Sequence, residues 1–269
     1  MYLMRNGAIE ELTPAADTGS LHDEAMTTLG ENLERLEDAI GAACRAAGRA
    51  RADVGLMAVS KTFPAETIAE AASLGLTLFG ENRVQEYATK ALRAAGLWTS
   101  AVPQRPRVHL IGHLQSNKSA KAAELFDGVD TLDSVRLAER LDEAAGRLGK
   151  RLPVLIEVKL STEETKAGVE PESDEIERLL DRLPDLGSLE MCGLMTIAPW
   201  GAPEDVTRAC FRSLRELRDR WAPAHPKLHF DVLSMGMSCD FGLAIAEGAT
   251  RIRVGTALFG KRKPQTVVE

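Results

Sequence analysis

The sequence predicts a single α/β domain, a closed barrel of eight parallel strands with an extra helix before the first strand. Strand-sized apolar segments alternate with helical patterns along residues 55–259, which is typical of repeated βα units. Segments such as LPVLIEV (152–158) are almost continuously apolar, as expected for strands buried on both faces. The length of 269 residues suits one barrel of about 200–250 residues with short ends. An open doubly wound sheet is the alternative, but VSKTFPAE (59–66) lacks its Gly-rich turn.

The N-terminal part divides into a leader and a helix. Residues 1–25 show no apolar period and are interpreted as a flexible leader, residues 26–263 as the barrel domain, and residues 264–269 as a tail. A helical period over 29–49 predicts a long helix, which would fill the place in the outer ring left open because only seven helices follow strands. Its apolar face consists of Leu33, Leu36, Ile40, Cys44 and Ala47.

The remaining elements follow from apolar runs and their punctuation. The predicted strands cover 55–60, 76–80, 108–112, 128–132, 153–160, 189–197, 228–235 and 251–259. The predicted helices cover 64–74, 82–95, 117–126, 134–148, 171–183, 203–221 and 240–247. Glycines suited to helix C-caps mark several of these ends.

Composition excludes several functional classes. The net charge of −7 disfavours binding to a nucleic acid backbone, which depends on clustered Lys and Arg. The apolar runs are too short for a membrane helix, and the N-terminus lacks the apolar region of a secretory signal. The four cysteines are widely spaced without a CxxC pair, so we expect no disulfide framework, no metal site and a cytoplasmic location.

The chemistry is expected at the carboxyl ends of the strands, where barrel active sites lie. Lys61 directly follows the first predicted strand, and a lysine in a dry barrel mouth can react with a carbonyl as a free amine. The alternative is a surface lysine at a strand–loop junction. Asn82 follows the second strand, either as a helix N-cap or as a ligand-facing amide. His109 and His113 are spaced for a metal on a helix, but in a strand they lie roughly 13 Å apart, so a metal pair is not expected.

Two turns after the seventh and eighth strands combine glycine with hydroxyl side chains. The first, SMGMSCD (234–240), contains Ser238, and the second, RVGT (253–256), contains Gly255 and Thr256. This is the recurrent phosphate site of barrel enzymes, because free backbone N–H groups there can point at an anion. Taken singly, each turn is also explained as a Ser N-cap or a Gly bulge.

Arg253 lies two residues before Gly255 and therefore shares its side of the strand. A buried arginine needs an acceptor, which is either a structural carboxylate or an atom of a bound ring. An amine, an anion cradle and an inward arginine together describe a site for an aldehyde that carries a phosphate. Pyridoxal 5′-phosphate (PLP) is such a molecule.

With these residues the sequence resembles the pyridoxal phosphate homeostasis protein family, whose barrel is that of the N-terminal domain of alanine racemase. The matching stretches are AVSKTFP (58–64), LFGENRVQE (78–86), HLIGHLQSNK (109–118), GLMTIAP (193–199), SMGMSCDFGLAI (234–245) and RIRVGTALFG (251–260). They occur in order from about residue 30 to residue 262. Relatives usually carry Val-Asn where this chain has Val158-Lys159, so any contact from that position is open.

The resemblance implies a role for each candidate residue. Lys61 would form the aldimine with PLP, and Arg253 would face the pyridine nitrogen. Phosphate contacts are implied for Ser238, Gly255 and Thr256. The residues implied to line the rest of the pocket are Asn82, Ser234, Gly236 and Met237.

The resemblance also implies PLP and vitamin B6 homeostasis as the function, without established turnover. Racemases of this fold use a second base, a tyrosine from a separate C-terminal domain, whereas the tyrosines here are Tyr2 and Tyr87. A guanidinium beside the ring disfavours the protonated pyridine that carbanion chemistry needs. We therefore expect a monomeric carrier that hands PLP to apo-enzymes. The alternatives are a weak PLP-dependent racemase or lyase, and an interaction protein with a vestigial site.

Overall fold

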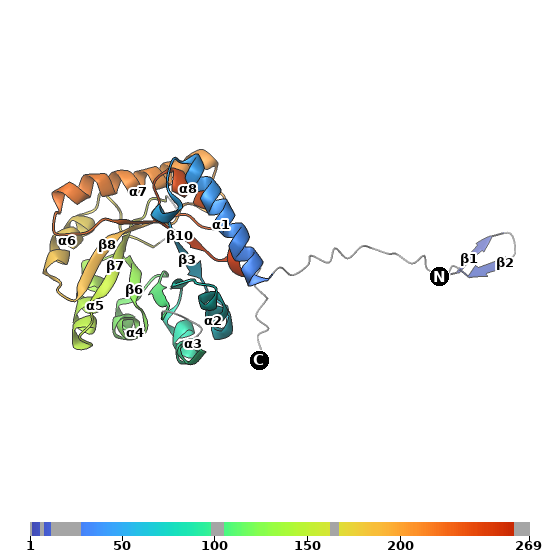
Figure 1. The fold of residues 1–269 in the computed structure, drawn as a ribbon, viewed down its shortest axis with the longest axis horizontal. Helices are drawn as coiled ribbons and strands as arrows, with labels where there is room; N and C mark the ends of the chain where they lie inside the picture. Colours follow the sequence, from blue (N-terminus) through green and yellow to red (C-terminus); the bar gives the residue numbers. More distant parts are fainter. Residues whose placement is uncertain (1, 6–7, 12–27, 98–104, 162–166, 261–269) are drawn as a thin grey trace.

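Eight parallel strands close into a barrel in the computed structural model of this protein (Figure 1). The structure describes residues 2–5, 8–11, 28–97, 105–161 and 167–260. The strands are β3 (Gly55–Val59), β4 (Leu78–Glu81), β5 (Arg107–Leu110), β6 (Gly128–Leu132), β7 (Leu152–Glu157), β8 (Leu189–Met195), β9 (Val232–Ser234) and β10 (Arg251–Val254). They follow one another in chain order, and β10 pairs with β3 to close the ring. The predicted fold class is thereby confirmed.

Helices pack around the outside of this barrel. They are α1 (Leu29–Ala46), α2 (Ala65–Ser73), α3 (Val84–Leu97), α4 (Ser119–Leu125), α5 (Val135–Arg147), α6 (Asp174–Arg182), α7 (Glu204–Ala224), α8 (Phe241–Ala246) and α9 (Thr256–Phe259). The described residues of the domain also form three 3₁₀ turns: η1 (Arg51–Asp53), η2 (Ser116–Lys118) and η3 (Leu183–Asp185). The alternation of strand and helix along the chain therefore becomes two concentric layers.

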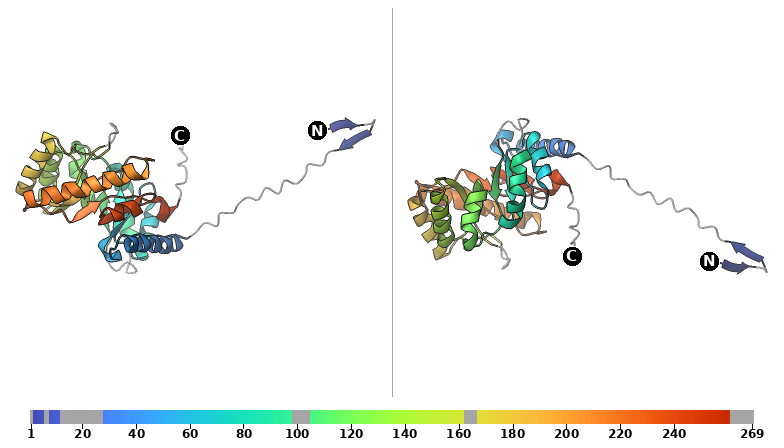
Figure 2. Two further views of the ribbon diagram at one scale, coloured as in Figure 1. Left: turned by 90° about the horizontal axis from the view of Figure 1, so that it is seen from above. Right: turned by 90° about the horizontal axis from the view of Figure 1, so that it is seen from below.

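Helix α1 occupies the position in the outer ring beside the closing strands, as the sequence predicts. It begins at a capping box in which Thr28 and Glu31 bond each other's backbone N–H. It packs against both α8 and α9 (Figure 2). The amide of Asn32 donates to the Leu258 carbonyl at 3.0 Å, and Arg49 donates to the carbonyls of Ile245 and Ala249. These bonds tie the start of the domain to its last two helices.

Side-chain alternation along the strands decides what enters the barrel. On β3, Met57 and Val59 belong to a small buried cluster with Leu78 and Ile111, whereas Ala58 belongs to the larger core between strands and helices. Lys61 follows two residues after the end of β3, in the turn that leaves the strand, and lines the cavity at the mouth of the barrel.

The barrel also holds a polar group of three residues, in which His109 and Asp130 are buried and Arg251 is partly exposed. His109 Nδ1 lies 2.8 Å from Asp130 Oδ1, and Arg251 Nη1 lies 3.1 Å from Asp130 Oδ2. Burial opposes ionisation of Asp130, but the neighbouring His109 and Arg251 hold its pKa below the usual value. His109 thus has a carboxylate partner inside the barrel, whereas His113 is exposed beside Asp133.

The structure differs from the prediction at both ends of the domain. The predicted strand 251–259 ends at Val254, and α9 follows Gly255, because Leu258 turns inward and is fully buried. Within the predicted leader, β1 (Tyr2–Arg5) and β2 (Ala8–Glu11) pair as an antiparallel ribbon that the sequence analysis did not expect. The rest of that leader up to residue 25 and the predicted tail 264–269 lie outside the described residues.

Candidate functional site

One cavity of about 630 Å³ opens at the carboxyl ends of the strands. Its volume falls within the range of about 300–1,000 Å³ that is usual for small-molecule sites. Seven of the nine candidate residues line it: Lys61, Asn82, Met237, Ser238, Arg253, Gly255 and Thr256. The other two, Ser234 and Gly236, are not among its lining residues and lie behind it. The remaining wall is mostly apolar and includes Val59, Ile111 and Ile197.

Lys61 sits in a loop whose backbone is held in an uncommon conformation. The next residue, Thr62, has a φ of 71°, a left-handed value that disfavours a β-branched side chain. The Thr62 N–H donates to Glu86 Oε1 at 2.6 Å, which compensates part of this strain. The loop therefore presents Lys61 in a defined direction.

A buried lysine and glutamate, which the sequence analysis did not single out, hold this loop from below. Lys90 Nζ donates to the carbonyls of Ser60 and Phe63 at 3.2 and 3.0 Å and lies 2.9 Å from Glu81 Oε1. Ser60 Oγ donates to the same Glu81 oxygen at 2.6 Å. Burial raises the pKa of Glu81, against the opposing charge of Lys90. The only sequence signal was a glutamate inside an apolar strand segment, LFGE.

Arg253 is fixed by three hydrogen bonds to its neighbours in the barrel. Its Nη1 donates to the Ser234 carbonyl at 2.7 Å and to Ser234 Oγ at 2.9 Å, and its Nη2 donates to the Thr196 carbonyl at 2.8 Å. Burial lowers the pKa of Arg253, although the carboxylates of Asp130 and Glu157 oppose this shift. The structure therefore gives Ser234 a role in positioning Arg253.

The turn after β9 depends on Gly236. This residue has a φ of 90°, and a Cβ built on it would lie 2.5 Å from Ala244 Cβ. Its carbonyl accepts the Arg253 N–H at 2.9 Å, so it too supports Arg253. The Met237 N–H donates to Asp240, whose pKa burial raises. Gly236 thus shapes the turn, while Met237 and Ser238 face the cavity.

The second turn lies directly beside the first in the cavity wall. Gly255 precedes α9, and Thr256 is the first residue of that helix. The Ala257 N–H donates to Ser238 Oγ at 3.4 Å, which links the two turns. The first N–H groups of a helix have no acceptor within it, so this wall offers backbone donors beside two hydroxyl groups. The structure therefore brings the two predicted turns together in the wall of the cavity that Lys61 also lines.

Asn82 belongs to the cavity wall, and the structure does not place it at the helix cap. Helix α3 begins at Val84, so the cap position falls on Arg83. A Cβ on Gly112 would lie 2.1 Å from the Asn82 carbonyl oxygen, so only glycine allows this close approach. Trp200, which is 79% exposed, lines the same cavity as Asn82. Of the two alternatives for Asn82, its position favours the ligand-facing amide.

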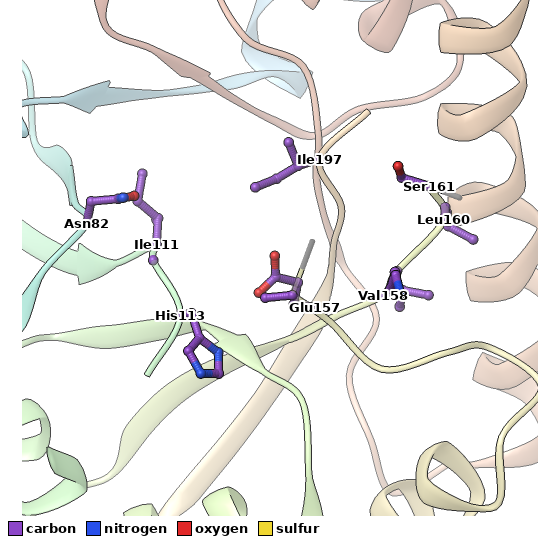
Figure 3. Close-up of a pocket in the computed structure, with 11 residues that line it drawn as sticks. Asn82, Ile111, His113, Glu157, Val158, Leu160, Ser161 and Ile197 are labelled. Atoms are coloured by element: carbon purple, nitrogen blue, oxygen red, sulfur yellow. The ribbon is translucent and has the colours of Figure 1, made fainter. Parts of the chain in front are cut away.

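A second, smaller cavity adjoins the first (Figure 3). The two cavities share Asn82, Ile111 and Ile197 in their walls. Glu157 and Lys159 line only the smaller one, and Lys159 Nζ lies 3.0 Å from Glu170 Oε1. The departure from the family pattern at Lys159 therefore falls beside the main cavity. Sequence reasoning did not consider Glu157.

The fold and the donor set define a barrel domain that can hold a phosphorylated carbonyl compound. One cavity combines a primary amine, a guanidinium, two hydroxyl groups and backbone donors. Residues 32–263 match the family model described as alanine racemase, N-terminal domain. An alanine racemase of Clostridium difficile, at 15% identity and a TM-score of 0.64, shares the fold.

Relatives of higher sequence identity show which family within this class of barrel the chain belongs to. The pyridoxal phosphate homeostasis protein of Aquifex aeolicus is 42% identical over 237 residues, covering 87% of this chain and 98% of the relative. That of Pseudomonas aeruginosa is 40% identical over 240 residues, covering 88% and 97%. This chain belongs to the pyridoxal phosphate homeostasis protein family, as the sequence motifs predict.

Solved structures agree with this assignment. PipY of Synechococcus elongatus without PLP has a TM-score of 0.76 and 41% identity, covering 87% of this chain and all of PipY. The PLP-bound form of PipY has a TM-score of 0.74 and 40% identity. Among the described helices of this chain, none is both long and apolar enough to cross a membrane.

Proposed function

We propose that this protein binds PLP reversibly in the main cavity and acts in intracellular PLP homeostasis. The observation that carries this proposal is the single cavity that brings Lys61 together with Arg253 and the Ser238 and Thr256 turns. A relative of about 40% identity binds PLP in its solved structure, and relatives of similar identity are named for PLP homeostasis. No disulfide joins the four cysteines, all of which lie in the part of the chain that the structure describes, and this supports the proposed cytoplasmic location.

Each residue has a role that follows from its chemistry. Lys61 Nζ supplies the amine for the aldehyde carbon, forming a C=N bond with loss of one water. Ser238, Thr256 and the backbone of the two turns hold the phosphate. Arg253, kept rigid by Ser234, donates to the ring nitrogen and disfavours its protonation. PLP can act as an electron sink when its ring is protonated, so this arrangement favours storage over turnover.

The proposal extends to delivery. A cofactor held in a cavity that opens at the strand ends remains accessible, so we propose that the protein hands PLP to apo-enzymes as a monomer. Incubation of the loaded protein with an apo-enzyme in the presence of a PLP scavenger tests this step. Activation that survives the scavenger supports direct transfer, and activation abolished by it means release into solution.

The test of the binding site is a visible spectrum followed by borohydride reduction and peptide mapping. The loaded protein should absorb as a lysine-bound form, and reduction should leave the label on the peptide that contains Lys61. Lys61→Ala should lose both signals while retaining its fold. Lys121→Ala, which alters an exposed lysine, is the matched control and should keep both. A label retained elsewhere in Lys61→Ala would refute the assignment.

A further inference from the structure

The smaller cavity beside the main one is a chamber with its own polar lining. Its volume of about 240 Å³ far exceeds the roughly 10–15 Å³ that one water needs, and is below the ~300 Å³ of drug-sized sites. Its polar lining includes Asn82, His113, Glu157, Lys159 and Ser161. The chamber therefore suits a small polar molecule.

Glu157 gives this chamber an acceptor with nothing to accept. The residue is only 4% exposed, and its Oε2 atom has no hydrogen-bond partner in the part of the chain that the structure describes. Figure 3 shows its carboxyl group directed into the space that the labelled side chains surround. A buried carboxylate oxygen without a donor is costly, so the site is complementary to a ligand that supplies N–H groups.

Two further polar side chains reach the chamber from the same extended segment. Glu157, Lys159 and Ser161 all line the cavity, together with the apolar Val158 and Leu160 that lie between them in the chain. Lys159 is 18% exposed at its side chain and pairs with Glu170, which is 60% exposed. An ammonium group has three donors, so this one ion pair leaves Lys159 able to bond an anion in the chamber.

We propose that this chamber binds a small α-amino acid, with its ammonium group at Glu157 and its carboxylate at Lys159. Glu157 and Lys159 are two positions apart in the chain and line the same small cavity, so one small molecule with two opposite charges can contact both. Asn82 and Ser161 add polar groups to the wall, and Ile111 and Ile197 give it an apolar part that a short aliphatic side chain can contact.

The position of the chamber connects this inference to PLP, and that connection rests on the proposed function. Asn82, Ile111 and Ile197 separate the chamber from the cavity that contains Lys61, and both cavities are lined by them. A bound amino acid would therefore lie next to PLP, and the affinity of the protein for PLP would depend on the amino-acid concentration. The binding site itself does not depend on Lys61.

The charges around Glu157 predict how binding depends on pH. Burial raises the pKa of Glu157 to about 7; Arg253 opposes this shift and Asp133 adds to it. Lys159 and His113 are the other titratable groups of the chamber. An ammonium ligand binds the ionised carboxylate, so affinity should rise from about pH 6 to about pH 8 as Glu157 loses its proton.

Calorimetric titration of the chain with L-alanine tests the site, using protein without PLP so that no amine can react with an aldehyde. Ethylamine and propionate, each lacking one charged group, serve as competitors. Glu157→Gln should weaken the binding of L-alanine and of ethylamine at least about tenfold, which corresponds to about 1.4 kcal/mol. The affinity of this variant should no longer rise with pH. Lys159→Met should weaken the binding of L-alanine and of propionate and leave the binding of ethylamine unchanged.

Glu190→Gln, which removes a half-exposed carboxylate on the neighbouring strand, is the matched control and should bind like the parent. The inference is overturned if L-alanine does not bind the parent, or if Glu157→Gln binds it with the same affinity and pH profile. PLP loading is measured in a separate experiment, by the absorbance of PLP bound to Lys61. Loss of that absorbance refutes the proposed function, whereas its retention without alanine binding refutes only this inference.

Discussion

The buried Lys90–Glu81 pair beneath the Lys61 loop allows stability to be separated from positioning. Lys90→Met removes the two bonds to the loop carbonyls of Ser60 and Phe63 and leaves Glu81 buried without its ion-pair partner. Ser60 Oγ remains as the donor to Glu81 Oε1. We expect both a loss of stability and a weaker hold on PLP, because the same lysine serves both.

The size of the effect follows from burial. Breaking a buried ion pair costs about 3–5 kcal/mol, a large fraction of the ~5–15 kcal/mol by which a domain is stable. Burial already raises the pKa of Glu81, and removing Lys90 raises it further. The folded state then binds more protons than the unfolded state, so the stability of Lys90→Met should fall as pH rises above the ordinary glutamate value of about 4.3.

Urea unfolding measures the free energy of unfolding of the parent, of Lys90→Met and of the double variant Lys90→Met/Glu81→Gln. The double variant should regain more than half of the lost free energy of unfolding, because no buried charge remains. Its PLP affinity should stay low, because the loop bonds are still missing. Lys121→Met, at an exposed pair with Glu124, should change stability by about 0.5 kcal/mol or less. If the double variant regained PLP affinity as well, Lys90 would not position the Lys61 loop.

Three further predictions follow from the same geometry. Gly236→Ala should cost about 2–5 kcal/mol in urea unfolding, from its positive φ and the contact with Ala244; a loss below about 1 kcal/mol would contradict the turn geometry. Ser238→Ala with Thr256→Ala should weaken PLP at least about tenfold in fluorescence titration, since hydrogen bonds to charged groups contribute about 1.5–3 kcal/mol each; unchanged affinity would place the phosphate elsewhere. Because burial raises the pKa of Glu157 to about 7, the free energy of unfolding of the parent should fall as pH rises from about 4.5 to about 7. Glu157→Gln should therefore have a free energy of unfolding up to about 3 kcal/mol higher than the parent at pH 8, and one close to the parent at pH 4. Equal gains in stability at the two pH values would refute the raised pKa.

Most elements were predictable because each strand and helix has a local pattern. Predicted and observed ranges coincide for β6 (Gly128–Leu132) and differ by one residue for β3, whereas the predicted ranges for β7 and β8 run past their observed ends at Glu157 and Met195. They differ where tertiary packing overrides the pattern. The apolar run after Gly255 is equally suited to a strand, but burial of Leu258 beside α1 makes it the short helix α9. The ribbon of β1 and β2 has too few residues for a recognisable period.

The candidate site was predictable where position along a strand decides direction. Lys61 follows the end of β3 and Arg253 lies near the end of β10, and turns rich in glycine and hydroxyls follow the last two strands. The roles of Ser234 and Gly236 were not predictable. Both lie in the expected turn, but only the packed barrel shows that they bond Arg253 from behind.

The amino-acid order alone determined the eightfold alternation, and with it the end of the barrel at which the chemistry gathers, because strand period and chain direction are local properties. Only the closed barrel decided which distant residues share a wall. Glu157 and Asn82 lie 75 positions apart and line one chamber, and Lys90 reaches back 30 positions to Ser60. Such contacts depend on strand register and side-chain packing, which involve the whole molecule at once and leave no periodic trace in the chain.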